Sequence, residues 1–304
     1  MPDARTAAQA AVRASLTADS LSLAAHWIYD VKAIQERFGR VDRLMDPAPG
    51  SYHKNRRAGQ FTHYGDQTAV LLESLAESKG FDASDFFRRW KLLFSDYDGY
   101  LDGATKQTLQ RIDMGHGPDA SGSGSNDLAG ASRMAPLLLC ADLDEDGLAR
   151  AARAQTRMTH NTPRILDAAE FFARSAHALL RGLGPVEAMQ LAARADYMDL
   201  PVSDWLEQGL EFAATDTVTA VAHFGQSCHV DGAMRSVIQI VARHRDDPAG
   251  GLVDNVMAGG DSAARGLLAG MLLGAAGGPE ALPGTWWDGL QRRADLEGFM
   301  GRVV

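Results

Sequence analysis

Residues 259–276 read Gly-Gly-Asp-Ser-Ala-Ala-Arg-Gly-Leu-Leu-Ala-Gly-Met-Leu-Leu-Gly-Ala-Ala, and they set the pattern for the whole chain. Apolar residues three and four positions apart predict a helix over Ser262–Ala276, and Asp261 is a favourable residue for its N-cap. The apolar run Gly266–Gly278 is too short and too rich in glycine to cross a bilayer. The stretch therefore predicts a buried helix of a globular protein, and we expect no membrane partner.

The same helical spacing recurs from one end of the chain to the other. It predicts further helices over Thr6–Trp27, Thr68–Glu77, Phe86–Phe94, Leu148–Met158, Pro163–Arg181, Pro185–Ala193, Asp204–Ala213 and Gly232–His244. Only Asp216–Phe224 is briefly strand-like, and the start of a helix is equally compatible with it. We therefore expect an all-α protein that forms one domain over residues 1–304.

One segment differs from this helical pattern. Gly115–Asp127 is rich in Gly, Ser and Asp and lacks core-forming residues. A linker between two domains is one interpretation, but the helical periodicity is alike on both sides and no change of composition follows. We therefore interpret the segment as a mobile loop beside a functional site, since long loops inside compact domains often carry function.

The composition excludes several classes of protein. The chain has 304 residues, with 30 Lys and Arg against 39 Asp and Glu, a net charge of −9 and a pI near 5.4. This acidity argues against a nucleic-acid partner, because binding to phosphates needs a basic surface. The two cysteines form no CxxC pair, and Met1–Ala11 lacks the apolar region of a secretory signal. We therefore expect a cytoplasmic protein.

Familiar catalytic motifs are absent from the sequence. It contains no GxSxG, no Walker A motif, no GxGxxG that follows a strand and no HExxH. Its nine histidines lie singly along the chain, so the spacing does not predict a zinc site. Cys140 follows three leucines and is interpreted as a small core residue rather than a nucleophile.

Aspartates near predicted helix starts are more informative. Asp66 and Asp261 each precede an apolar helix, where an aspartate commonly caps the free N–H groups of the first turn. The two glycines before Asp261 would also let the backbone approach a ligand closely. Asp19 lies in the apolar first helix, where a buried carboxylate needs a partner. Carboxylate oxygens without a thiolate suit Mg²⁺, so these residues indicate a carboxylate site.

Several of these segments, in their order, resemble the ADP-ribosylglycohydrolase family, and more closely its J-crystallin branch. The resemblance rests on Ala18–Tyr29, Tyr64–Thr68, Ala131–Leu137, Thr159–Pro163, Gly259–Ser262 and Gly270–Ala275. It implies a compact orthogonal bundle of helices. It also implies hydrolysis of a glycosidic bond to ADP-ribose, with two Mg²⁺ ions in a cleft between helices.

The acidic motifs depart from the family's pattern. Members have Thr-Asp-Asp where this chain has Gly65-Asp66-Gln67, and Gly-Asp-Thr-Asp-Thr where it has Gly260–Ala264. Two Mg²⁺ ions carry four positive charges, whereas Asp66 and Asp261 supply only two negative ones. We therefore expect at most one Mg²⁺ ion, with Asp66, Asp261 and Ser262 as its ligands. Asp19, Asp102 and Asp127 are candidate replacement acids.

The resemblance also suggests roles for individual residues. It makes Asp19, Asp66 and Asp261 the candidate catalytic residues, and we expect the last two to meet in space. Candidate substrate-binding residues are Trp27, Asn126, Asp127, Arg133 and His160. Each has a structural alternative: Trp27 as a core residue, Arg133 as a structural arginine and His160 as a helix-end histidine bonded to backbone. Carboxylates without a metal, one of raised and one of ordinary pKa, would be another way to supply acid and base.

Two functions follow as expectations. The first is a hydrolase that cleaves an N- or O-glycosidic bond to ADP-ribose or a related ribosyl compound, on a small molecule or an ADP-ribosylated protein. The second is a family member of reduced or no activity that binds a nucleotide-like ligand or serves as a structural, crystallin-like protein.

Overall fold

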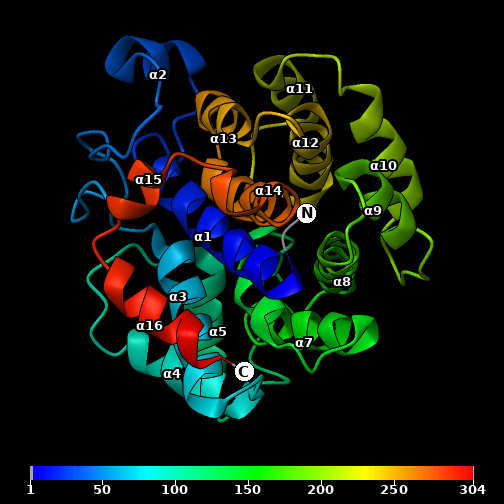
Figure 1. Cartoon of the computed structure of the whole chain (residues 1–304). Coiled ribbons are helices and arrows are strands. Elements are labelled where there is room, and N and C mark those ends of the chain that lie inside the picture. The colour runs from blue at the N-terminus through cyan, green and yellow to red at the C-terminus, as the bar shows by residue number, and fades with distance from the viewer. Residues whose placement is uncertain (1–2, 304) are drawn as a thin grey trace.

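The computed structural model describes residues 3–303 and is built from helices (Figure 1). Within this range there are sixteen α-helices and two short 3₁₀ helices, and no strand, which confirms the all-α prediction. The α-helices are α1 Ala4–Ser22, α2 Val31–Phe38, α3 His63–Ser78, α4 Ala83–Leu93, α5 Gly103–Asp113, α6 Ala129–Ser132, α7 Glu145–Arg157, α8 Pro163–Leu180, α9 Pro185–Ala192, α10 Val202–Glu211, α11 Thr217–Phe224, α12 Val230–Arg243, α13 Pro248–Met257, α14 Ser262–Gly277, α15 Gly284–Asp288 and α16 Arg293–Arg302. The 3₁₀ helices are η1 Ala135–Leu139 and η2 Gly278–Glu280.

Helices α1 and α14 pack against each other at the centre of the molecule (Figure 1). Small residues allow this close approach: a Cβ atom at Gly274 would lie 2.5 Å from the Cβ of Ala14 and 2.7 Å from the carbonyl oxygen of Ala10. The other helices surround this pair, with α3, α4 and α16 packed together on one side and α7, α8 and α9 on another.

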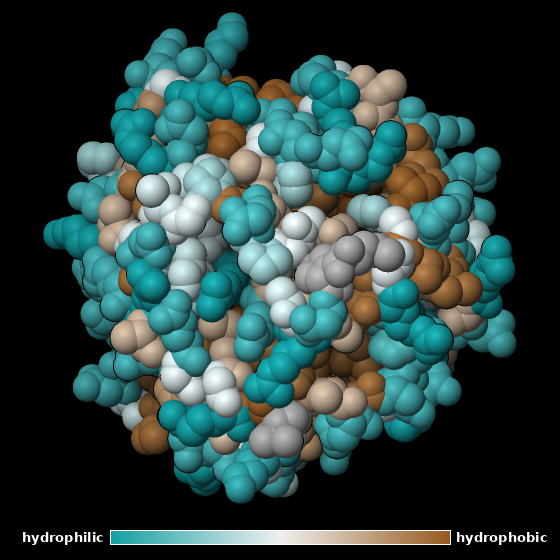
Figure 2. Space-filling view, viewed as in Figure 1, coloured by the Kyte–Doolittle hydropathy of each residue, from teal (hydrophilic) through white to brown (hydrophobic). Residues whose placement is uncertain are grey.

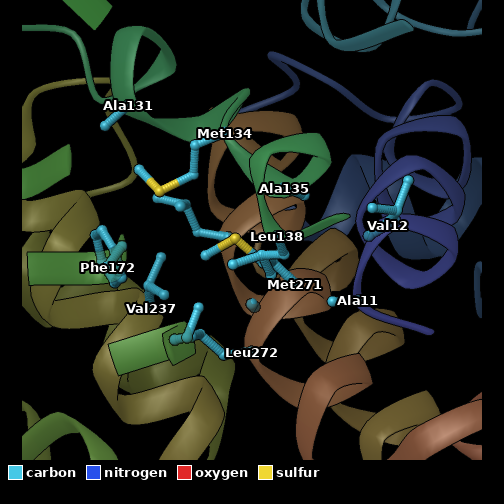
Figure 3. Packing of buried hydrophobic residues seen from close by; sticks show 14 of the residues in the cluster. Ala11, Val12, Ala131, Met134, Ala135, Leu138, Phe172, Val237, Met271 and Leu272 are labelled. Atoms are coloured by element: carbon cyan, nitrogen blue, oxygen red, sulfur yellow. The ribbon is translucent and has the colours of Figure 1, made fainter. Parts of the chain in front are cut away.

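Apolar side chains from many helices fill the spaces around the central pair. Figure 3 shows Met134, Leu138, Phe172, Val237 and Met271 gathered between the helices, and all are buried or nearly so. The cluster to which they belong includes residues from Ala8 to Val303. The face drawn in Figure 2 is largely hydrophilic, with scattered apolar residues. Among residues 3–303, none of the helices combines the length and hydropathy needed to cross a membrane.

The segment 115–127 is bonded to the helical part of the structure. Its second half lies against the turn that follows α7: the N–H of Ser123 donates to the carbonyl of Thr159 at 2.9 Å, and the N–H of Asn161 donates to Ser123 at 2.9 Å. The hydroxyl of Ser121 donates to the carbonyl of Met158 at 2.7 Å. These bonds place the segment, and Asp127 at its end, beside the helical core, and the predicted mobility of the loop stays a prediction.

Candidate functional site

Asp19 of α1 is buried and holds the beginning of α3. Its carboxylate accepts hydrogen bonds from the N–H of Thr62 at 2.8 Å, the hydroxyl of Thr62 at 2.6 Å and the N–H of Gly65 at 3.2 Å. The contact requires glycine at position 65, because a Cβ atom there would lie 2.2 Å from the Oδ2 of Asp19. Burial raises the pKa of Asp19 to about 7, against the opposite effect of these hydrogen bonds. The partner that the sequence analysis required is therefore a helix N-terminus.

Asp66 lies in the first turn of α3, whose N-cap is Thr62, so the helix begins five residues earlier than Thr68, the start we predicted. The Oδ2 of Asp66 forms an ion pair with Arg56 at 2.7 Å and accepts a hydrogen bond from the hydroxyl of Tyr97 at 2.6 Å. Burial raises the pKa of Asp66, and the guanidinium of Arg56 opposes that rise. The positive charge of Arg56 thus balances the negative charge that Asp66 would offer to a cation.

Asp261 caps α14 and lies in a group with two residues from other segments. Oxygens of Asp127 and Asp261 and the sulfur of Cys228 all lie within 4.8 Å of one another. The loop is held there by backbone bonds of 2.9 Å from Leu128 to Cys228 and from Val230 to Asn126. Asp127, an expected substrate-binding residue, is therefore the acid that meets Asp261. No hydrogen bond or ion pair joins Asp66 to Asp261 within residues 3–303, and their meeting in space stays a prediction.

The two glycines before Asp261 bring its backbone against a neighbouring segment. Gly259 and Gly260 have φ angles of 70° and 65°, a region that favours glycine. A Cβ atom at Gly260 would lie 2.1 Å from the carbonyl oxygen of Gln226. The close approach expected from this pair is therefore to the protein itself.

Asp127 and Asp261 differ in the neighbouring groups that shift the pKa of each carboxyl. Burial and the nearby charge of Asp261 raise the pKa of Asp127 well above its ordinary value. Burial also raises the pKa of Asp261, but Arg265 and a hydrogen bond from the N–H of Ala264 oppose that rise. Burial likewise raises the pKa of the Cys228 thiol. Two close carboxyl groups with unlike surroundings favour one protonated and one ionised member.

Arg133 is fully buried and bonded within the protein. Its guanidinium donates to the side-chain oxygens of Gln67 and Thr159 and to the carbonyl of Gly130 at 3.4 Å. Burial lowers the pKa of Arg133 to about 10. The structural alternative for Arg133 is thus observed, and its contact with a substrate stays a prediction.

The hydrogen bonds around the former acidic positions show which ligand atoms are free to bind Mg²⁺. The Oε1 of Gln67, where the family carries a second aspartate, accepts from Arg133 and from the Nε1 of Trp90 at 2.7 Å. Ala263 offers no ligand atom, and Asp66 is paired with Arg56. The hydroxyl of Ser262 is buried and has no hydrogen-bond partner among the described residues, and Asp127 is the acid that lies near Asp261. With Gln67 and Asp66 bonded inside the protein and Ala263 without a ligand atom, at most one Mg²⁺ ion stays the prediction.

Asn126 and His160 are two further residues that were predicted to bind substrate. Asn126 is exposed, and its Oδ1 accepts a hydrogen bond from Thr162 at 3.1 Å. His160 is buried beside Gly130, and its Nδ1 lies 3.0 Å from the hydroxyl of Thr159. Burial lowers the pKa of His160 to about 3. Its observed contacts are those of a structural histidine.

Trp27 has an unusual backbone and a set of aromatic neighbours. Its φ of 64° is in a region that residues other than glycine rarely adopt, and its N–H donates to Gly260 at 2.8 Å. The ring stacks on His26 with centroids 4.4 Å apart and meets Tyr100 edge-on at 5.1 Å. Trp27 also packs partly buried against a small cluster around Tyr64 and Ala263, separate from the main core.

Three histidines meet beside Trp27, and the sequence did not predict this cluster. His26, His53 and His63 are buried together, although they come from three separate segments of the chain. Their spacing of 27 and 10 residues matches no metal motif, so only the fold could bring them together. Asp102 touches this cluster: its Oδ2 lies 3.1 Å from the Nε2 of His63, and it also caps α5. The place of Cys228 beside Asp127 and Asp261 was likewise not predicted.

Comparisons with known proteins agree with this architecture. A family model described as ADP-ribosylglycohydrolase matches residues 1–304. Crystallin J1B of Tripedalia cystophora is 24% identical over 317 residues, covering 98% of this chain and 96% of its own. Crystallin J1A of the same organism is 24% identical over 301 residues, covering 93% and 91%. A solved structure titled ADP-ribosylglycohydrolase-related protein complex has a TM-score of 0.77 and 24% identity, and covers 100% of this chain and 98% of its own.

Proposed function

Since this chain belongs to the ADP-ribosylglycohydrolase family, we propose that it hydrolyses an N- or O-glycosidic bond to ADP-ribose or a related ribosyl compound. The observation that carries the proposal is the pair Asp127 and Asp261, whose oxygens lie within 4.8 Å of each other. Asp127 is partly accessible, whereas Asp261 is buried. A pair with these unlike surroundings supplies an acid and a base at one place.

The protonated and ionised members of the pair would take different roles. Asp127, whose pKa is raised, keeps a proton that it donates to the leaving atom as the glycosidic bond breaks. Asp261 stays ionised beside Arg265 and the hydroxyl of Tyr64, which lies 3.4 Å from its Oδ2. It stabilises the positive charge that develops on the ribose and accepts a proton from the attacking water. The water completes the ribose hydroxyl, and the leaving group departs with the proton of Asp127.

Magnesium has a limited place in this proposal. We propose at most one weakly bound Mg²⁺ ion near Asp261 and Ser262, because Gln67 and Ala263 stand where the family carries acids. The acid and base roles above require no ion. The activity should therefore survive removal of divalent cations, to a degree that a chelator measures directly.

The test is release of ADP-ribose by the full chain from mono-ADP-ribosylated proteins and from small ADP-ribose derivatives, with and without Mg²⁺. Replacing one general acid or base typically lowers a rate by about 10²–10⁴-fold, so Asp127→Asn and Asp261→Asn should each cost that much. Asp119→Asn changes an exposed acid of the same loop and serves as the control. Equal rates for Asp127→Asn and Asp119→Asn would remove Asp127 from the mechanism.

A second function is supported by the pairing of Asp66 with Arg56 and by relatives that are named crystallins. In this alternative the chain binds a nucleotide-like ligand without cleaving it, or serves as a stable structural protein. No release of ADP-ribose from any substrate, together with calorimetric binding of ADP-ribose, would favour the ligand binder. The absence of both would favour the structural role.

A further inference from the structure

Three buried histidines converge beside the acids already described. His26 follows α1, His53 lies in the loop before α3, and His63 is the first residue of α3. Their exposed fractions are 3%, 2% and 1%, so all three side chains are buried. Each ring offers one nitrogen, and the three nitrogens lie within 4.8 Å of one another. Three imidazoles from separate segments thus meet at a single point.

These rings have polar atoms that nothing in the protein satisfies. Within residues 3–303, both ring nitrogens of His26, both of His53 and the Nδ1 of His63 have no hydrogen-bond partner. A buried polar atom without a partner costs about 1–3 kcal/mol, so several at one place call for a ligand. Burial lowers the pKa of His26, and lowers that of His53 to about 3, which keeps these rings neutral. The neutral imidazole is the form that binds metal.

Two of the three rings have a carboxylate oxygen close to one of their nitrogens. The Oδ2 of Asp102 is 3.1 Å from the Nε2 of His63, which leaves Nδ1 as the free nitrogen of that ring. The Oδ1 of Asp261 lies 3.6 Å from the Nδ1 of His26. Metal-bound histidines usually direct their second nitrogen at a carboxylate, which fixes the ring and raises its basicity. The same acids would also balance the charge of a divalent cation.

We propose that His26, His53 and His63 bind one borderline transition-metal ion of the Zn²⁺ class. Imidazole nitrogens suit Zn²⁺, whereas Mg²⁺ prefers oxygen. Nitrogens bound tetrahedrally at about 2.0–2.1 Å stand about 3.3 Å apart, so nitrogens that now lie within 4.8 Å of one another approach by at most about 1.5 Å on binding. Three protein ligands leave a fourth position for water.

The surroundings provide a way in for the ion. A cavity of about 300 Å³ is lined by His53 together with Tyr52, Arg56, Tyr100 and Lys106. Trp27 and Tyr100 form walls around the histidines, with centroid distances of 5.3 Å and 5.5 Å to the ring of His63. An ion that enters past His53 would reach a largely dry, aromatic-lined site.

The test is calorimetric titration of the chelator-treated full chain with ZnCl₂, supported by the visible absorption of tetrahedral Co²⁺. We expect one Zn²⁺ per chain. His53→Gln removes a ligand whose ring bonds to nothing else and should abolish this binding. Asp102→Asn keeps an N-cap for α5 but removes the carboxylate, so it should weaken binding by about 10–100-fold. His177→Gln, a half-buried histidine of α8 outside the cluster, is the control and should bind like the natural chain.

Two results would overturn the proposal. One is no Zn²⁺ binding by the natural chain, with far-UV circular dichroism showing that it is folded. The other is binding that survives His53→Gln and is lost in Cys228→Ser, which would place the ion at Asp127, Cys228 and Asp261 instead. Should His53→Gln not fold, Asp102→Asn decides the matter: affinity unchanged from that of His177→Gln contradicts the assignment. Because the readout is metal binding, failure here leaves the proposed hydrolysis untouched.

Discussion

At the scale of single residues, four aspartates of identical chemistry have different surroundings, and these act differently on the pKa of each carboxyl. Asp19 accepts bonds from a helix N-terminus, Asp66 pairs with Arg56, and Asp127 faces Asp261. Burial raises the pKa of all four carboxyls, and their neighbouring charges and hydrogen bonds differ. The sequence gives no sign of this difference, because each partner comes from a distant segment or a loop.

Asp19 makes stability depend on pH in a defined direction. Its carboxyl loses its proton near pH 3.9 when unfolded and near pH 7 when folded. Between these values only the folded state holds the proton, so this contribution to the free energy of unfolding is full below about pH 4 and lost as pH rises through about 7. Between pH 5 and pH 8 the loss is about 2–3 kcal/mol.

Asp19→Asn removes this titration while it weakens the bonds to Thr62 and Gly65. The variant should be less stable than the natural chain at every pH, by a margin that narrows as pH rises from 5 to 8. Urea unfolding at a series of pH values measures that margin. Buried histidines of lowered pKa change stability in the opposite direction, but equally in both proteins. A margin that is constant with pH would show that Asp19 is ionised throughout.

Gly65 gives a second prediction at this scale. Gly65→Ala should destabilise the fold by about 1–3 kcal/mol, because its Cβ would lie 2.2 Å from a carboxylate oxygen that caps α3. Gly103→Ala, at the start of α5 with open space around its Cβ, is the matched control. Chemical unfolding of both variants checks this, and equal stabilities would contradict the packing described.

At the scale of elements, periodicity predicted the long helices and missed those that depend on caps or on tertiary contacts. All nine predicted helices are present, and Asp216–Phe224, which was compatible with strand or helix, is α11. The prediction for the first helix was wrong at its end: α1 stops at Ser22, five residues before Trp27. Helices such as α5 and α16 are largely polar, and packing rather than an apolar stripe selects them.

The candidate site was predictable only in part, for the same reason. Asp261 as a helix cap and Asp19 as a buried acid with a partner follow from local pattern and are confirmed. The meeting of Asp127 with Asp261, and of three histidines with one another, depends on how distant loops fold over the helices. A single sequence contains no local signal for such contacts.

The packing of α1 on α14 gives the prediction at this scale. Gly274→Ala adds a Cβ atom 2.5 Å from Ala14 and 2.7 Å from the carbonyl oxygen of Ala10, so it should cost about 1–3 kcal/mol. Gly298→Ala in α16, with nothing nearer than 4.0 Å, should instead stabilise by about 0.4–1 kcal/mol. Denaturant unfolding distinguishes the two signs, and stabilisation by both would refute the tight helix contact.

At the scale of the whole molecule, one apolar cluster runs from Ala8 in α1 to Val303 and includes residues on both sides of the 115–127 loop. The single domain stays a prediction, and calorimetry tests it: one cluster should unfold in one transition, with equal calorimetric and van't Hoff enthalpies.

Leu296 in α16 provides the sharper version of this test. It is fully buried, so Leu296→Ala should cost about 2–5 kcal/mol. In one cooperative unit that cost moves the whole transition to lower temperature. A variant in which only part of the heat absorption moves would mean that the C-terminal helices unfold independently.

The two ends of the described chain also meet, since the Nη2 of Arg5 donates to the carbonyl oxygen of Val303 at 3.4 Å. Their order along the polypeptide is therefore not dictated by the three-dimensional arrangement. A circular permutant could join them through a short glycine-serine linker and open the chain within the exposed turn Gly115–Gly117. The new ends of such a protein would lie ten to twelve residues before Asp127 in the sequence. A reporter or capture tag fused there would be attached near the acids and away from the central helices.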